Sequence, residues 1–281
     1  MTGPAAPAPP EIGPVRALAA LYTTNISTNV RNHLQYRFGA VVRTVGFLVE
    51  PVVYLAVWTT IADQRGGEVA GLSTGTLAAY YIVWTLVRIM NIVYTPYGFE
   101  RRIQRGDFNA QLLRPAHPIH YDLSFFAGYN LTALTTWLPA AVLLVVLFRP
   151  ALSPQPLEIA VFAVAIWGAY LVRSMYLWAL GMTSFWTTRA SAAFELYTVC
   201  ELLFSGRLVP MDLMPPAVRA AADWLPFYWT FGFPIEALVL DLGTADLLRG
   251  LAMQVLWTAV GALLVAALWR RAVRRYTAVG N

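Results

Sequence analysis

Long apolar runs separated by short polar stretches dominate the chain after its first forty or so residues. Each run approaches the ~20 residues that an α-helix needs to cross a hydrocarbon core of ~30 Å. The runs are continuously apolar rather than alternating, which argues against the strands of a transmembrane barrel. We therefore predict an all-α, polytopic membrane protein. Its six transmembrane helices are expected over residues 38–61, 77–94, 123–148, 157–180, 192–204 and 247–269.

The N-terminal region differs from the rest of the chain. Residues 1–14 are rich in Pro and Ala and lack the basic start and apolar run of a signal peptide, so we expect a disordered tail. Residues 15–37 mix apolar side chains, such as Leu18 and Leu21, with Arg and Asn. We interpret them as an amphipathic helix on the cytoplasmic membrane surface, with an ordinary soluble helix as the alternative. Residues 38–281 are then one transmembrane domain.

Composition and charge support a membrane location. Apolar residues make up 58% of the chain and charged residues only 12%, whereas about a quarter of a soluble domain is charged. A net charge of +5 can indicate nucleic-acid binding, but the arginines lie between apolar runs and form no single stripe. We therefore expect membrane lipid, and no nucleic acid, as a partner. Most arginines fall in the loops on the side of the two termini, which places both termini in the cytoplasm.

The polar loop after the second run predicts a short amphipathic helix close to the inner membrane surface. Phe99 and Ile103 stand four residues apart and share one face, and Gly106 suits a helix end. This segment is either a handle for a cytoplasmic partner or an ordinary solvated loop beside a membrane span. Its candidate residues are Tyr97, Phe99, Glu100, Arg101, Arg102, Ile103, Arg105, Gly106 and Asp107.

The outer loop after the fifth run is too apolar for a free loop and too broken by prolines for one straight helix. We expect short helices that dip into the outer leaflet and pack on the bundle, because broken backbone at that depth must be buried. The residues that mark this re-entrant segment are Gly206, Pro210, Pro215, Pro216, Leu225, Pro226 and Phe227.

Several ionisable residues interrupt the apolar runs, where a charge is costly and usually faces the bundle interior or water. They either line a substrate pathway or form ion pairs between helices. Arg43 is expected to extend to the inner surface instead. The candidates for the pathway or for pairing are Glu50, Arg88, Arg173, Glu195 and Glu201.

Three stretches carry a resemblance to a known family. They are E-R-R-I-Q-R-G-D-F-N-A-Q-L-L-R-P at 100–115, S-G-R-L-V-P-M-D-L-M-P-P at 205–216 and W-L-P-F at 224–227. Together with the N-terminal helix and six spans, they resemble the permeases of ABC-2 type exporters over nearly the whole chain. The resemblance implies a membrane-spanning subunit that forms the substrate pathway of an exporter. It also implies a second permease, the same or homologous, and two ATP-hydrolysing subunits.

The resemblance assigns roles to the two loops. Residues 97–107 would form the coupling helix that docks on the nucleotide-binding subunit and ends at Gly106. Residues 206–227 would form the re-entrant pair of short helices that closes the outer end of the pathway. The residues expected to contact the ATPase are Glu100, Arg101, Arg102 and Arg105.

The chain lacks the sequence motif of an ATP-hydrolysing subunit, as expected for a permease. The phosphate loop G-x-x-x-x-G-K-[ST] needs a lysine, and the chain contains none. We therefore expect no enzyme, no catalytic or cofactor-binding residue and no metal site, with ATP and Mg bound by the partner ATPase. Two other classes stay open, an ion-coupled secondary transporter, which should show internal repeats, and a membrane-embedded lipid-modifying enzyme. The expected location is the plasma membrane of a bacterium, and the substrate stays open.

Overall fold

The structure of the protein is a computed structural model that describes residues 13–276, except 36, 65, 70, 188 and 189. The side chains of 33–48 and of residue 63 also lie outside the description. The predicted tail at 1–14 therefore falls almost entirely outside the described residues, and so does the side chain of Arg43.

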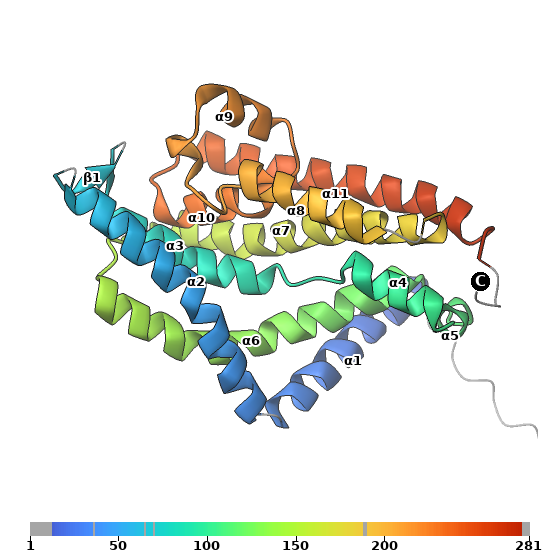
Figure 1. Ribbon diagram of the computed structural model, residues 1–281. Helices are drawn as coiled ribbons and strands as arrows, with labels where there is room; N and C mark the ends of the chain where they lie inside the picture. The colour runs from blue at the N-terminus through green and yellow to red at the C-terminus, as the bar shows by residue number, and fades with distance from the viewer. Residues whose placement is uncertain (1–12, 36, 65, 70, 188–189, 277–281) are drawn as a thin grey trace, which may run out of the picture.

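Helices form nearly all the regular structure of the described residues (Figure 1). The longer helices are α1 (Pro14–Gln35), α2 (Arg37–Gln64), α3 (Thr74–Met90), α6 (Pro118–Phe148), α7 (Pro156–Met182), α8 (Ala190–Phe204) and α11 (Thr244–Ala272). The shorter helices are α4 (Pro96–Gln104), α5 (Phe108–Leu112), η1 (Thr183–Phe185), η2 (Met211–Leu213), α9 (Pro216–Asp223), η3 (Tyr228–Thr230) and α10 (Gly232–Val239). Strands β1 (Glu68–Val69) and β2 (Leu72–Ser73) form a small antiparallel hairpin between α2 and α3.

Among the described residues, three helices are long and apolar enough to cross a membrane, namely α6, α7 with the η1 turn that continues it, and α11. A shorter apolar stretch, Val49–Ala62, lies within α2. The three long helices agree with the apolar runs predicted at 123–148, 157–180 and 247–269. The other three predicted spans correspond to α2, α3 and α8, and crossing by these helices stays a prediction.

Helix α3 is buried on nearly every side. It begins after Ser73, whose hydroxyl accepts a hydrogen bond from the Thr76 backbone N–H. Tyr80, Tyr81 and Trp84 are almost fully buried and pack in one cluster with residues of α2, α7 and α10. A helix that is apolar around its whole circumference needs such an enclosed place. With only 17 residues, α3 is nevertheless the helix at the centre of this cluster.

The chain leaves the helical conformation after Met90, four residues before the predicted end of this element. The side-chain amide of Asn130 donates to the carbonyls of Met90, at 2.8 Å, and of Ile92, at 3.1 Å. Arg173 donates to the carbonyl of Asn91 at 2.6 Å. These donors satisfy carbonyl groups that the broken helix leaves open, so a non-helical segment is tolerated in the interior. No local sequence signal marks this break.

Helix α1 lies along the first half of α6. Its half-buried positions recur with helical spacing, and they include Leu18, Tyr22 and Ile26. The Tyr22 hydroxyl lies 3.1 Å from His120 Nδ1, and Asn25 donates to the Ser124 hydroxyl at 2.9 Å. The helix predicted at 15–37 corresponds to α1, whereas its position on the membrane surface stays a prediction.

The two ends of the bundle differ in their elements. Helices α4 and α5 and the end of α11 gather at one end, whereas the β1–β2 hairpin lies at the other (Figure 1). Between α8 and α11 the chain forms the short pieces η2, α9, η3 and α10. This agrees with the predicted short helices, since Pro216 begins α9 directly after Pro215. How deeply this segment enters a membrane stays a prediction.

Candidate coupling helix and interior charge network

Helix α4 is attached to α7 through a buried aromatic side chain. Phe99 is fully buried, and its ring lies 4.8 Å from that of Trp178 and 5.3 Å from that of Tyr94, centre to centre. On α7, Gly181 makes room for it, because a Cβ there would come within 2.2 Å of the Phe99 ring. The predicted apolar face of Phe99 and Ile103 thus packs against the bundle, with Ile103 partly buried in the same cluster.

An ion pair attaches α4 to α6. Both terminal nitrogens of Arg102 donate to the Asp122 carboxylate, at 2.8 and 2.7 Å, and Trp178 donates to the same carboxylate at 2.9 Å. The guanidinium also lies 3.8 Å from the centre of the Tyr94 ring. Burial alone would lower the pKa of Arg102, but the hydrogen bonds and charge of Asp122 outweigh burial and leave that pKa raised. Arg102 is therefore held as a cation within the chain.

A third contact joins α4 to the start of α8. The Glu100 carboxylate accepts a hydrogen bond of 2.8 Å from the backbone N–H of Ser191, in the first turn of α8. N–H groups at this position have no partner within their own helix, and a carboxylate suits the positive end of the helix dipole. The Tyr97 ring lies 5.3 Å from that of Phe194, which adds an apolar contact between the two helices.

The remaining face of α4 is exposed. Tyr97 is 46% exposed, and Arg101, Arg105 and Asp107 are exposed as well. Gly106 ends the helix with a φ of +72°, in the left-handed region that favours glycine, as its sequence position predicts. Of the residues predicted to contact an ATPase, Arg101 and Arg105 are thus on the surface, whereas Glu100 and Arg102 have partners inside the chain.

Four of the five predicted intramembrane charges form two ion pairs. Arg88 of α3 lies 2.7 Å from Glu50 of α2. Arg173 of α7 donates twice to Glu201 of α8, at 2.7 and 3.0 Å. The fifth residue, Glu195, is on the exposed side of α8 and joins neither pair among the described contacts. These two pairs are ion pairs between helices, which the sequence left open as the alternative to residues that line a substrate pathway.

Arg207 joins the two pairs, although the sequence assigned it to the outer loop. Its guanidinium lies 3.6 Å from Glu201 and 3.9 Å from Glu50. The chain turns back after α8 at Gly206, with a φ of +76°, and the Tyr80 hydroxyl donates to the Gly206 carbonyl at 2.8 Å. A short S-G-R turn directly after an apolar helix was the available signal. We call Glu50, Arg88, Arg173, Glu201 and Arg207 the charge network.

The outer residues named from the sequence fall into two groups. Gly206, Pro210 and Pro226 are buried in the turns of this segment. Pro215 and Pro216 are exposed at the start of α9, and Leu225 is half-buried. The Phe227 ring lies 5.2 Å from that of Tyr197 on α8, so the segment packs back on the bundle.

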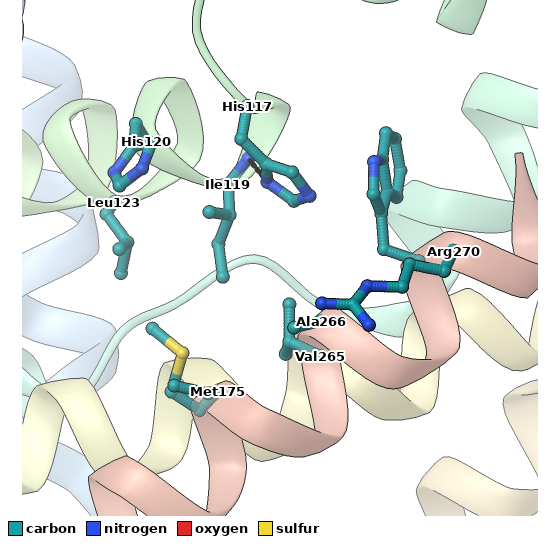
Figure 2. Close-up of a pocket in the computed structure, with 10 residues that line it drawn as sticks. His117, Ile119, His120, Leu123, Met175, Val265, Ala266 and Arg270 are labelled. Carbon is teal, nitrogen blue, oxygen red and sulfur yellow. Dashed lines mark hydrogen bonds between the residues drawn. The ribbon is translucent and has the colours of Figure 1, made fainter. Parts of the chain in front are cut away.

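An apolar cavity of about 320 Å³ lies near the α4 end, between α6, α7 and α11. Figure 2 shows His117 and His120 on one side of it and Met175 and Val265 on the other. Burial, with a smaller effect of the His120 charge, lowers the pKa of His117 to about 4, so this ring is neutral near pH 7.

The long apolar helices and the charge network in their interior define a helical, multi-pass membrane protein. The family model described as ABC-2 family transporter protein matches residues 48–280, so the chain belongs to the ABC-2 transporter family. This family provides membrane permease components of ABC transporters, in which the ATPase is normally a partner subunit. The comparison with curated proteins finds no match.

Proposed function

We propose that the chain is the permease subunit of an ABC exporter, in which it forms the substrate pathway and takes its energy from a separate ATPase through α4. Family membership and the absence of a phosphate loop in the sequence support this proposal. In the proposed assembly six helices cross the plasma membrane of a bacterium, with both termini in the cytoplasm. Two permeases, identical or homologous, work with two ATPase subunits, which bind ATP and Mg.

The observation that carries the proposal is the attachment of α4 to three helices at once. Phe99 packs against α7, Arg102 pairs with α6, and Glu100 caps the start of α8. A force on the exposed face of α4 therefore reaches three helices through direct contacts. A solvated loop would have little need of these attachments.

The geometry divides the predicted contact residues by role. Tyr97, Arg101, Arg105 and Asp107 form the exposed face that we assign to ATPase docking. Glu100 and Arg102 are positioning residues, since they hold α4 on α8 and α6. In the same proposal the segment from Gly206 to Phe227 closes the outer end of the pathway.

The test is a charge reversal on the exposed face of α4. In the double variant Arg101→Glu, Arg105→Glu, we expect normal membrane insertion because neither side chain is buried. Binding to a co-expressed ABC ATPase should weaken about tenfold or more, as is typical for lost charge pairs at a partly buried interface. Transport should fall with it. Copurification of the ATPase on the tagged permease measures the first effect.

The control is Arg219→Glu with Arg249→Glu, two exposed arginines outside α4 whose partners are Asp212 and Asp223. This variant should retain the ATPase. Normal ATPase retention and transport by the α4 variant would contradict the coupling role of α4. Transport by the purified chain without any ATPase, driven by an ion gradient, would instead support the secondary-transporter alternative.

A further inference from the structure

The charge network contains more positive than negative groups. It joins three arginines to two glutamates, from α2, α3, α7, α8 and the turn after α8. Two of its members lie well inside long helices. Glu50 stands 13 residues after the start of α2, and Arg173 stands 17 residues after the start of α7, which at 1.5 Å per residue is ~20 and ~26 Å. A net positive charge at this depth is costly without an anion.

Arg207 is the arginine without a carboxylate of its own. Glu201 is fully buried and already accepts two hydrogen bonds from Arg173, and Glu50 lies 2.7 Å from Arg88. Arg207 reaches both carboxylates only at 3.6 and 3.9 Å, which is beyond hydrogen-bond distance. Its Nε is buried without a hydrogen-bond partner among the described residues. The guanidinium therefore retains capacity for one more acceptor.

Among the described side chains, no carboxylate other than Glu50 and Glu201 lies within ion-pair distance of the three arginines. Residues 33–48, whose side chains are not described, contain no Asp or Glu. On α8 the nearest other acid is Glu195, which is exposed and stands six residues, ~9 Å along the helix axis, before Glu201. The described part of the chain thus leaves one positive charge uncompensated.

The network is open to the outside of the chain. The Glu50 side chain is 33% exposed and that of Arg88 is 25% exposed, although both helices are otherwise apolar here. Charged groups do not face hydrocarbon, so this opening faces either water or another molecule. Exposed apolar side chains lie beside this opening on α2, where Val49 is 61% exposed and Val53 is 52% exposed. Such surroundings suit a ligand that is partly charged and partly apolar.

We propose that the charge network binds the acidic group of the transported substrate, which is an amphiphile with one negative charge. This inference rests on the proposed function, since it names the substrate class of the same permease. Arg207 holds the carboxylate, sulfonate or phosphodiester of the substrate, because a guanidinium binds such groups with two parallel hydrogen bonds. The anion balances the third arginine, and the apolar body of the substrate contacts the exposed valines Val49 and Val53 beside Glu50 on α2.

The experiment uses the purified permease–ATPase complex in lipid nanodiscs. Decanoate, decanol and decyltrimethylammonium, each below its micelle-forming concentration, are compared as stimulators of ATP hydrolysis. We expect stimulation by decanoate and little by the neutral and cationic compounds. Arg207→Gln should raise the half-maximal decanoate concentration about tenfold or more, the loss expected for a charge-assisted hydrogen bond. Arg207→Lys, which keeps the charge, should lose less.

The control is Arg249→Gln, which removes an exposed arginine of α11 outside the network and should respond to decanoate like the wild type. Equal stimulation of the wild type by all three compounds would overturn the inference, and so would an unchanged response in Arg207→Gln. If Arg207→Gln does not assemble, the wild-type selectivity and Arg207→Lys decide the question. The proposed function fails separately, if no ATPase binds the permease, whereas a bound and active ATPase without acid selectivity overturns this inference alone.

Discussion

Arg173 connects three segments through one guanidinium, since it donates to Glu201 on α8 and to the Asn91 carbonyl at the end of α3. Glu201 is fully buried. An uncompensated buried charge is far more costly than the loss of a complete pair. When one residue of this pair is replaced, the loss of stability therefore depends on whether the charge that is left finds another partner.

Glutamine substitutions of this pair should have unequal effects. Glu201→Gln leaves Arg173 and Arg207 without their shared carboxylate and should cost about 3–5 kcal/mol of unfolding free energy. Arg173→Gln should cost less, because Arg207, at 3.6 Å, remains beside Glu201. The double variant should recover part of the loss. Thermal unfolding of the four proteins in detergent measures the coupling, and additive losses would argue against the ion pair as a unit.

At the scale of elements, the position of α4 depends on close packing between Phe99 and Gly181. A Cβ at Gly181 would overlap the Phe99 ring, so Gly181→Ala should displace the ring and cost about 1–3 kcal/mol, as overpacking does. We expect weaker ATPase retention together with a lower unfolding temperature. Gly243→Ala is the control, because a Cβ there meets only the Asp246 carboxylate, at an ordinary 3.6 Å. If Gly181→Ala behaves like this control, α4 is not held by its contact with α7.

Local patterns predict the elements themselves but few of the contacts between them. The four-residue spacing of Phe99 and Ile103 correctly predicts a buried face, and Gly106 correctly marks the end of α4. The attachments of Glu100 to Ser191 and of Arg102 to Asp122 join parts of the chain that only the fold brings together. In the sequence, Glu100 and Arg102 are two of several charged residues in this loop. A helix surrounded by solvent would contain such residues as well.

The same distinction applies to the interior. The apolar runs predict α6, α7 and α11, because a continuous run of that length has few alternatives. The end of α3 at Met90 depends on donors from Asn130 and Arg173, so no local pattern could show it. Arg207 lies in a polar turn by sequence, and its place in the charge network follows from the fold of the chain after α8.

At the scale of the whole molecule, the arginine-rich segments meet at one end. The start of α8 contacts α4 through Ser191, and the Tyr276 ring, beyond α11, lies 6.1 Å from that of Phe108 on α5. Figure 1 shows α4, α5 and the end of α11 together at this end. The chain therefore returns to it after the second, fourth and sixth of the predicted spans. In the six-span topology the chain crosses the membrane twice between successive returns to the same side, which agrees with this arrangement.

The topology can be tested by cysteine labelling in a Cys200→Ala background. Arg105 and Arg274 are exposed at the arginine-rich end, whereas Asp212 is exposed in the outer segment after α8. Because loops rich in arginine stay in the cytoplasm, Arg105→Cys and Arg274→Cys should react with a membrane-impermeant maleimide only after the cells are permeabilised. Asp212→Cys should react in intact cells, and labelling of all three after permeabilisation controls for access to the thiols. Reaction of Arg105→Cys in intact cells would place α4 outside, where no ATPase can reach it, and would refute both the six-span topology and the coupling role of α4.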